Sequence, residues 1–463
     1  MDAASLVSAW DVTVLQLAAS FTSPTARTWR QIALGWVLHH KPAVTTGFRG
    51  FIRVLGDLAD RTWTVYHKFF YRARWSLDDL CAQLLVHAIE PMLIEAGRVE
   101  RRTGRPIADL NIDDTTAARY GKHVAHAGWF KDASASGMAT KGTVIHWAHN
   151  WIIGAVTLRL PAWPKTRWVL PVLFALYRKP GDCSGAHPFQ TRQQLAAQMV
   201  QNAVKTLPNV HWRIAADGQY ATRELVAALP EGVNLVSRIR GDAAIYELPK
   251  PRRKGQRGRP AKKGKRLPTP RELAQRRKAG WKTHTFQKQG RTVRRLVWSI
   301  TCLWYRVGRA APIRLVIVRD PSGVQKDDLL FCTDATPGAP DRQIVQRYFD
   351  RWGVEESILE SKQLMGFENT RGWCSRTVNR QAPLAMVLTT LVKCWYARCA
   401  AKEPSLLPEQ VPWYRHKTRP SFTDMLSALR RVIWSDRISS NSCMSRKVQK
   451  ITETLMYALS AAA

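Results

Sequence analysis

Apolar residues in the first hundred positions recur at intervals of three and four, which is the period of one helix face. The clearest example is the segment Leu77–Ile89. Alternation of apolar and polar residues, the mark of a half-buried strand, is rare in this part of the chain. The pattern therefore predicts a helical region over residues 1–105.

Short apolar runs that are typical of strands begin near residue 106. They occupy residues 107–112, 144–160, 168–176, 210–215, 233–239, 293–305, 313–318 and 329–332. A helical segment, Thr222–Leu229, lies between the fourth and fifth of these runs and follows a turn at Gly218. Strands that first follow one another and then alternate with helices predict a mixed α/β sheet with flanking helices.

A long helical pattern runs from about Asp341 to Met365. Pro340 stands directly before it and Gly366 directly after it, and these residue types commonly begin and end helices. Beyond Pro383 the chain is rich in leucine, alanine and methionine at helical spacing. This pattern predicts a helical C-terminal region.

The composition is that of a folded protein with a large excess of positive charge. The 463 residues are 45% hydrophobic and 23% charged, which permits more than one hydrophobic core and excludes disorder of the whole chain. Lysine and arginine number 71 against 35 acids, so the formal net charge is +36. Such a chain needs a polyanionic partner, and nucleic acid is the commonest. A membrane is not expected, because no apolar run approaches the roughly 20 residues of a spanning helix.

The N-terminus and the cysteines indicate a compartment. Asp2 stands where an export signal carries positive charge, and Asp11 interrupts the apolar stretch that follows. The eight cysteines include no Cys-x-x-Cys pair, which favours free thiols over a disulfide frame or a zinc site. The expected localisation is therefore the cytoplasm, in association with the nucleoid.

Two histidine pairs, His123-x-x-His126 and His146-x-x-His149, have a spacing that zinc sites also use. No cysteine accompanies them, and the connection between the pairs offers no obvious closure of a site. We expect these histidines to contact phosphate or solvent instead.

The segment 250–278 carries fourteen lysines and arginines and a single acid, Glu272. Like charges separated by proline and glycine bury almost nothing, so we expect a loop or arm without fixed structure until it meets phosphate. The tetrapeptide Arg-Gly-Arg-Pro at 257–260 resembles the core of an AT-hook, which enters a narrow minor groove; simple phosphate contact is the alternative. The DNA-contacting residues predicted in this segment are Arg257, Arg259, Lys262 and Lys263.

Four polar residues of the helix predicted from Asp341 share one stripe. At about 100° per residue, Arg351, Glu355 and Lys362 fall within about 60° of Tyr348. A carboxylate flanked by two cations and a phenol can present an acidic metal ligand beside phosphates. The alternative is a surface helix on which Arg and Glu one turn apart contribute about a few tenths of a kcal/mol.

The spacing Tyr348-x2-Arg351-x3-Glu355-x6-Lys362 resembles the Tyr-Arg-Glu-Lys signature of bacterial insertion-sequence transposases. These enzymes belong to the DDE group, whose catalytic core is similar to ribonuclease H. The resemblance extends to Ile-Asp-Asp-Thr-Thr at 112–116, Ala-Ala-Asp-Gly-Gln-Tyr at 215–220 and Leu-Leu-Phe-Cys-Thr-Asp at 329–334.

The resemblance implies a role for each matched residue. Glu355 takes the position of the catalytic glutamate and Asp217 that of the second aspartate. Asp114 is preferred as the first aspartate, because the family's residue directly precedes a threonine, and Asp113 is the alternative. The remaining signature residues are implied to contact the DNA phosphates, and they are Tyr348, Arg351 and Lys362.

Three acids from distant parts of the chain suit hydrolysis of a phosphodiester. Two divalent cations can neutralise the charge on the attacking and leaving oxygens. Mg²⁺ and Mn²⁺ prefer carboxylate oxygen as a ligand. We therefore expect Asp114, Asp217 and Glu355 to hold two Mg²⁺ or Mn²⁺ ions.

The resemblance also divides the chain. The 138 positions from Asp217 to Glu355 (355 minus 217) exceed what one strand and a helix need, which implies a mainly β insertion domain that interrupts an RNase H-like mixed sheet. Trp281, Trp298 and Trp304 are candidates there for stacking on a displaced base, or for the core. The expected parts are a helical N-terminal DNA-binding domain (1–105), the first part of the catalytic core (106–240), the insertion domain (241–326), the rest of the core (327–382) and a helical C-terminal region (383–463).

The expected function is that of a DNA transposase that cleaves and joins insertion-sequence ends. Its partner is double-stranded DNA, as element ends and as target, and a homodimer is expected in the synaptic complex. One alternative is a transposase-derived DNA-binding protein without strand transfer. Another is a plain nuclease of the same fold.

Overall fold

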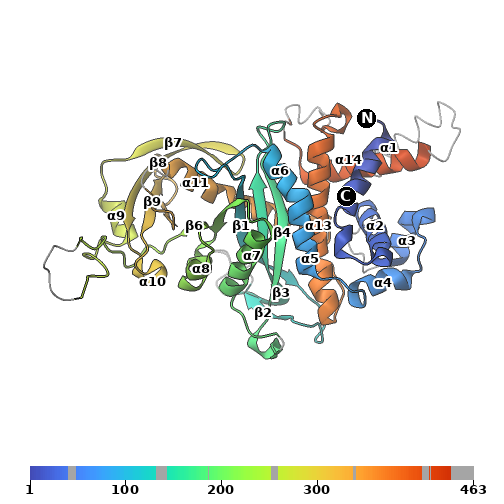
Figure 1. Cartoon of the computed structure of the whole chain (residues 1–463), viewed down its shortest axis with the longest axis horizontal. Helices are drawn as coiled ribbons and strands as arrows, with labels where there is room; N and C mark the ends of the chain where they lie inside the picture. Colours follow the sequence, from blue (N-terminus) through green and yellow to red (C-terminus); the bar gives the residue numbers. More distant parts are fainter. Residues whose placement is uncertain are drawn as a thin grey trace. The chain divides into compact units, whose positions relative to one another are not determined.

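The computed structural model describes residues 1–39, 48–131, 143–185, 187–251, 259–336, 340–408, 417 and 419–439. The chain forms two compact units, and each is assembled from separate stretches of sequence (Figure 1). Unit 1 comprises Met1–Arg98, Asp114–Phe189 and Glu356–Ala463, and unit 2 comprises Val99–Asp113 and Gln190–Glu355.

Unit 1 contains most of the helices. They are α1 (Ala3–Leu15), α2 (Ser23–Leu38), α3 (Phe48–Leu55), α4 (Trp63–Tyr71), α5 (Leu77–Leu84), α6 (Glu90–Glu95), α13 (Ser375–Cys399) and α14 (Phe422–Ser439). A π-helical turn, Leu85–Ile89, joins α5 to α6. The helical structure predicted for the two ends of the chain is therefore observed in the described residues, while the predicted domain boundaries stay predictions.

Helix α1 and the turn after it form one stretch, Ala3–Ser20, that is long and apolar enough to cross a membrane by length and composition. The sequence pattern did not predict such a stretch. One face packs inward through the buried Leu6, Trp10 and Val14, whereas Val12 and Leu15 are exposed. The indole of Trp395 in α13 also donates a hydrogen bond to the carbonyl of Leu6 at 3.1 Å.

Arginines from the C-terminal helices bind the carboxyl ends of the N-terminal helices. Arg430 of α14 donates to the carbonyl of Val37 at 2.7 Å and to that of His39 at 3.2 Å, where α2 ends. Arg437 donates to the carbonyls of Val54 and Leu55 at the end of α3. The last carbonyls of a helix have no partner within it, so these guanidinium groups supply the missing donors.

Arg380 of α13 makes the same kind of contact with the end of α4. It donates to the carbonyls of Phe69, Phe70 and Trp75, and its guanidinium lies 4.3 Å from the Trp75 ring centroid. Burial lowers the pKa of Arg380 and of Arg430 to about 10, so both remain charged at neutral pH. The N-terminal helices therefore depend on residues more than 300 positions away.

The strands of unit 1 are antiparallel. They are β2 (Gly128–Lys131), β3 (Ile145–Leu158) and β4 (Trp168–Tyr177), and β3 pairs with β2 on one side and with β4 along most of its length. Strand β1 (Ile107–Ala118) is the other neighbour of β3, and its last five residues belong to this unit. The Lys393 ammonium of α13 donates to the carbonyl of Val169, which ties that buried helix to β4.

Unit 2 is built on a mixed sheet in the order β1-β5-β6-β10-β9-β8-β7. Strands β1, β5 and β6 are parallel and the remaining neighbours are antiparallel. The mixed α/β class is therefore confirmed. The bounds are β5 (His211–Ala216), β6 (Asn234–Arg238), β7 (Lys282–Lys288), β8 (Arg291–Cys302), β9 (Ile313–Arg319) and β10 (Asp328–Cys332).

Most strands of unit 2 coincide with predicted apolar runs, but β7 was not predicted. The helices of this unit are α7 (Arg192–Thr206), α8 (Arg223–Ala228), α9 (Pro270–Arg276), α10 (Tyr305–Gly308), α11 (Asp341–Asp350) and the start of α12 (Trp352–Leu364). Helices α7, α9 and α10 were not predicted. The longest of these is α7, which begins with a capping box in which the side chains of Thr191 and Gln194 bind each other's backbone N–H groups. Threonine followed three residues later by glutamine is the signal that could have found it.

The lysine- and arginine-rich segment is more ordered than the sequence predicts. Residues 252–258 lie outside the described residues, but Pro270–Arg276 form α9. The helix starts at a capping box between Thr269 and Glu272. The expectation that the whole segment lacks fixed structure is therefore wrong for residues 270–276, because the single acid of the segment caps a helix.

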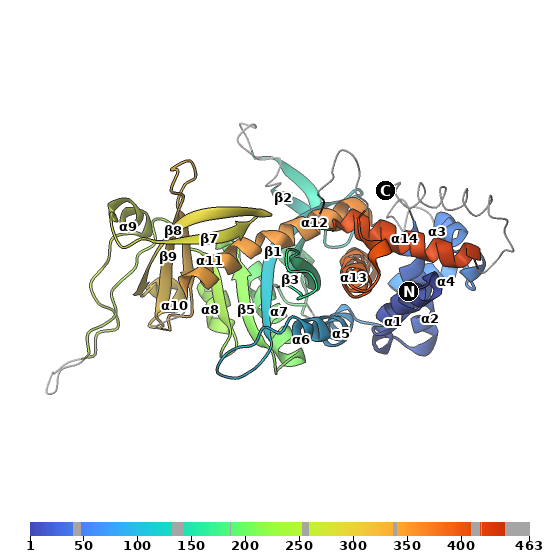
Figure 2. The ribbon, with the colours of Figure 1, turned by 90° about the horizontal axis from the view of Figure 1, so that it is seen from above.

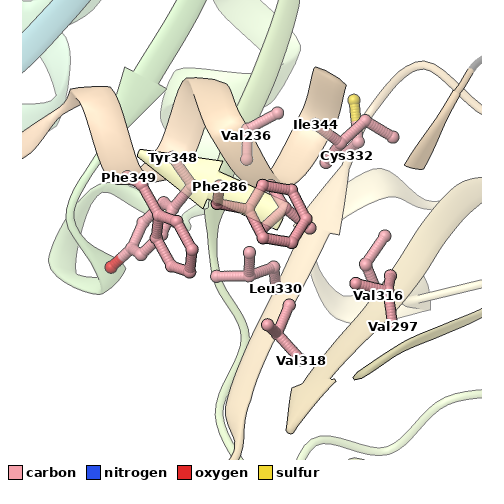
Figure 3. Packing of buried hydrophobic residues seen from close by; sticks show 11 residues of the cluster. Val236, Phe286, Val297, Val316, Val318, Leu330, Cys332, Ile344, Tyr348 and Phe349 are labelled. Carbon is pink, nitrogen blue, oxygen red and sulfur yellow. The ribbon is translucent and has the colours of Figure 1, made fainter. Parts of the chain in front are cut away.

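Helix α11 packs across the sheet of unit 2 and forms its main core. Figure 2 shows it beside strands β7–β9 when the molecule is seen from above. Figure 3 shows Tyr348 and Phe349 of α11 among apolar side chains of the sheet, with the Phe349 ring edge-on to Phe286 at 5.5 Å. Because Tyr348 and Phe349 pack into this hydrophobic cluster, the end of α11 is held against the sheet, and so is the start of the chain that follows.

Replacing Arg430 by methionine tests the arginine contacts. We expect the free energy of unfolding to fall by about 2–4 kcal/mol, because the buried carbonyls of Val37 and His39 lose a charged donor. The measurement is urea unfolding at pH 7 followed by tryptophan fluorescence. The control is Arg376→Met on α13, where the arginine is exposed and makes one backbone contact, and its effect should stay below about 1 kcal/mol. Equal effects of the two changes would contradict the role given to Arg430.

Candidate active site

Two of the candidate acids lie directly after the last paired residues of two adjacent parallel strands. Strands β1 and β5 pair from Ile107 with His211 to Ile112 with Ala216. Asp113 and Asp217 are the next residues on the two strands. Residues opposite one another in a parallel pair point to the same face, whereas successive residues point to opposite faces. Asp113 therefore continues the register toward Asp217, and Asp114 belongs to the other face.

Arg351 joins two carboxylates in unit 2. Its Nη1 donates to Asp113 Oδ2 at 2.6 Å, and its Nη2 donates to Glu355 Oε1 at 2.9 Å. The two donor nitrogens belong to one planar guanidinium, so the two bound oxygens lie within roughly 8 Å of each other. The arginine that the sequence assigns to DNA phosphate is thus engaged inside the protein, and its side chain is only 9% exposed.

The charge of Arg351 is fixed by its surroundings. Burial acts to lower the pKa of the guanidinium, but Asp113, the Tyr348 phenol, Glu355 and Asp217 together outweigh it and raise the pKa. Asp217 thus contributes to the same electrostatic field as Asp113 and Glu355. Asp113 and Glu355 bind this buried cation directly, and Asp217 acts on it through its charge.

A second arginine that the sequence analysis did not consider completes this arrangement. The guanidinium groups of Arg238 and Arg351 lie 5.9 and 5.7 Å from the centroid of the Tyr348 ring. Arg238 also donates to Asp328 Oδ1 at 2.9 Å, and its side chain is 55% exposed. Burial opposes its charge, yet Tyr348, Asp328 and Asp217 raise the pKa of Arg238 overall. Its position at the end of the predicted strand 233–239 is the signal that could have found it.

Tyr348 is mainly a core residue. Its ring belongs to the apolar cluster of α11 and the sheet. Burial is the main cause that raises the pKa of the phenol to about 12, so Tyr348 stays neutral at working pH. The sequence predicts a contact between Tyr348 and DNA. Only the small exposed part of this side chain could make it.

The other signature residues have partners within unit 1. Asn150 Nδ2 donates to Asp114 Oδ2 at 3.0 Å. Lys362 donates to the carbonyl of Thr116 at 2.7 Å and pairs with Glu368 at 2.6 Å. The ammonium group predicted to contact phosphate is therefore bound to a carboxylate and to the backbone of β1. The contacts described for Asp114 and Lys362 are thus with residues of their own unit.

The histidines do not form a zinc site in the described part of the chain. No group of three or more histidine, cysteine, aspartate or glutamate side chains that could hold a metal ion is found among the described residues. His149 accepts a hydrogen bond from Arg119 Nε at 2.7 Å through Nδ1, so its Nε2 donates to the carbonyl of Ala125 at 2.9 Å. Burial, followed by the charge of Arg119, lowers the pKa of His149 to about 3.

The predicted DNA-contacting residues of the basic segment differ in their surroundings. Arg257 lies outside the described residues, and Arg259 and Lys262 are exposed. The Lys263 ammonium lies 4.1 Å from the centroid of the Tyr246 ring and 5.5 Å from that of Tyr305. Lys263 is thus partly committed to a contact within unit 2.

The three candidate tryptophans of residues 241–326 are also distinguished. Trp304 is buried and meets the Phe331 ring at 5.1 Å, so it is a core residue. The rings of Trp281 and Trp298 are only partly buried, and each is covered by an arginine, Arg319 and Arg277 respectively. These two remain candidates for base stacking.

Oxygen ligands of the type that Mg²⁺ and Mn²⁺ prefer are present around Arg351. In this structure the guanidinium of Arg351 lies between Asp113 and Glu355 and supplies the positive charge there. The oxygen donors therefore suit a hard divalent cation by type, but among the described residues no three acidic side chains are grouped closely enough to hold one. Access of a cation to both acids requires Arg351 to release at least one of them.

Comparison with known families identifies the class of this protein. The sequence profile of a family described as DDE superfamily endonuclease matches residues 17–302, more than half of the chain. The chain therefore belongs to that family. The matched residues include all three aspartate candidates, Asp113, Asp114 and Asp217, and end before the helix that carries Glu355.

Other comparisons are less informative. A solved structure titled as the cryo-EM structure of a piggyBac transposase synaptic complex with hairpin DNA is similar, with a TM-score of 0.42 and 10% identity. The similarity covers 96% of this chain and 80% of the other. At that score it carries no further weight. No curated protein matches the chain.

The low pKa of His149 predicts a dependence of stability on pH. Between pH 6.5 and about 3 the unfolded chain binds a proton at this position and the folded chain does not, so the contribution of His149 to stability is complete above pH 6.5 and falls as the pH falls. The variant His149→Asn keeps an acceptor for Arg119 and cannot titrate.

The measurement is the free energy of unfolding from urea titrations between pH 7.5 and 4.5. The variant should be less stable at pH 7.5 and should show a flatter decline on acidification than the wild type. Parallel curves for the two proteins would contradict a neutral, buried His149.

Proposed function

We propose that this protein is a DNA transposase that cleaves element ends by metal-dependent phosphodiester hydrolysis and joins them to target DNA. The observation that supports this most directly is the binding of Asp113 and Glu355 by one guanidinium, that of Arg351, together with the place of Asp217 directly after the paired residues of β5. Membership of the DDE superfamily endonuclease family supports the nuclease step. The strand-transfer step and the insertion-sequence relationship rest on the Tyr-Arg-Glu-Lys spacing.

In this proposal the chain's own residues bind the metal and position the phosphate. The three carboxylates would hold Mg²⁺ or Mn²⁺, which supply charge neutralisation at the attacking and leaving oxygens. Arg238, half exposed and close to the acids, would bind a non-bridging phosphate oxygen. Arg351 would exchange a carboxylate for phosphate when the acids are neutralised. A homodimer acting on paired ends in the cytoplasm remains part of the proposal.

The proposal favours Asp113 over Asp114 as the first aspartate. Asp113 shares a cation with Glu355 in unit 2, while the carboxylate of Asp114 binds Asn150 in unit 1. Asp114 could still offer its other carboxylate oxygen to a metal, so the preference for Asp113 rests on the register of β1 with β5 and on the shared cation. The threonine after Asp114 is thus a weaker guide than the register of β1 with β5.

Isosteric changes of the acids test the proposed site. With DNA flanking the gene as the substrate and Mg²⁺ present, Asp217→Asn, Glu355→Gln and Asp113→Asn should each reduce end cleavage at least about a hundredfold, because one metal ligand is lost. DNA binding by a gel-shift assay should persist. Asp114→Asn is the matched control and should retain most of the cleavage. Loss of cleavage in Asp114→Asn alone would assign the first ligand to Asp114, and full cleavage by Asp217→Asn would remove the proposed site.

A plain endonuclease is the second candidate function, and the description of the matched family favours it. The two functions differ in one product. A transposase joins the freed 3′ end to a second DNA, whereas an endonuclease leaves it free. Incubation of pre-cleaved ends with a supercoiled plasmid and the active protein distinguishes them.

The exposed cations of the basic segment should set part of the salt dependence of DNA binding. Changing Arg259 and Lys262 to glutamine should lower the slope of log affinity against log salt by up to about 1.8, since each lost phosphate contact contributes about 0.9. Lys263→Gln is the comparison, and its effect should be smaller because this ammonium lies over the Tyr246 ring. The measurement is fluorescence anisotropy with duplex DNA over a salt series. An unchanged slope in the double variant would show that the segment does not contact phosphate.

A further inference from the structure

Unit 1 exposes several large aromatic side chains close together. Tyr120 is 92% exposed, Trp129 57% and Trp373 68%. Trp129 of β2 pairs directly with Trp147 of β3, and their ring centroids are 5.7 Å apart in an edge-on contact. Exposed aromatic groups of this size commonly mark a binding surface when they lie together.

One loop, residues 119–127, connects these rings. The indole of Trp147 donates to the carbonyl of Gly121 at 3.2 Å, next to Tyr120. The N–H of Ala125 donates to the carbonyl of Trp373 at 2.8 Å. Tyr120, Trp129 and Trp373 therefore border the same loop, and we call these three residues the aromatic patch.

Two cations lie beside the aromatic patch. Lys179 Nζ donates to the carbonyl of Trp129 at 2.9 Å, which fixes one positive charge beside the patch. Lys122, an exposed residue of the connecting loop, provides another.

We propose that the aromatic patch binds unpaired nucleotides of a DNA strand. Rings that stack on bases, combined with cations that contact the backbone, are the chemistry by which proteins bind single strands. A duplex offers its phosphates to such a surface but keeps its base faces stacked. The inference deepens the proposed function, because cleavage near an element end exposes nucleotides of this kind.

A membrane surface is the alternative partner for aromatic and basic side chains. It is less favoured, because the aromatic patch lies on strands and loops instead of the apolar face of an amphipathic helix. A protein partner is also less favoured, since rings flanked by Lys122 and Lys179 match the base faces and the phosphates of a nucleotide strand. Both alternatives are outcomes of the experiment below.

The experiment measures the affinity of the full chain for a fluorescein-labelled single-stranded 12-mer and for its duplex by anisotropy. The variant with Leu at all three positions of the patch (Tyr120→Leu, Trp129→Leu, Trp373→Leu) keeps apolar bulk and removes the rings. Single-strand affinity should fall about five- to hundredfold for each base that loses its stacking partner, and duplex affinity should change less than about threefold.

Two control variants test whether the loss of affinity is caused by the missing aromatic rings. The variant with Phe at the same three positions restores aromatic faces and should recover most of the single-strand affinity. Trp63→Leu removes an exposed indole of α4 outside the patch and should leave both affinities unchanged. Unchanged single-strand affinity of the triple Leu variant, or an equal loss for single strand and duplex, would overturn the proposal.

Two further outcomes separate the alternatives. Loss of binding to vesicles containing phosphatidylserine, with single-strand affinity retained, would assign the patch to a membrane and overturn the proposal. The binding measurement needs neither a divalent cation nor cleavage of the DNA. Absence of cleavage by the wild type would therefore count against the proposed function alone and would leave the binding measurement valid.

Discussion

One guanidinium determines how the acidic side chains of unit 2 are arranged. Arg351 binds Asp113, which lies 238 positions away in the sequence, and Glu355 one helical turn ahead. Three carboxylates near one another would repel strongly in a buried setting without a cation. The arginine supplies that cation, and the packing of α11 against the sheet holds it in place. The candidate active site therefore depends on a core helix as much as on the acids themselves.

Buried arginines also bind oxygen acceptors in unit 1, where they stabilise the ends of helices. Arg380 and Arg430 bind the last carbonyls of α4 and α2 instead of carboxylates. Burial lowers the pKa of each of these guanidinium groups to about 10, yet they stay charged at neutral pH. A chain with a formal charge of +36 thus places some of its cations inside the fold. The net charge alone consequently overstates the positive charge available to nucleic acid.

Membership of the DDE superfamily endonuclease family and the geometry around Arg351 support the proposed function from different parts of the chain. The family match covers residues 17–302, while Arg351 and Glu355 lie beyond it. The two observations meet at Asp113 and Asp217, which are within the matched region and next to each other at the edge of β1 and β5. The aromatic patch adds a surface suited to unpaired nucleotides.

Sequence patterns were sufficient for most strands, although not for β2 and β7, because hydrophobic period is a local property. They also predicted the helical stretch from Asp341 to Leu364, which the structure divides into α11 and α12 at Arg351. They also identified Asp217 and Glu355 as candidates through spacing. The choice between Asp113 and Asp114 could not be made locally, since both follow the same strand run and only pairing with β5 decides which face each side chain takes. The presence of Arg238 beside Tyr348, and the binding of Lys362 to Glu368, likewise depend on contacts between distant segments. Periodicity determines which residues form an element, whereas tertiary packing decides which charged groups lie within hydrogen-bonding distance.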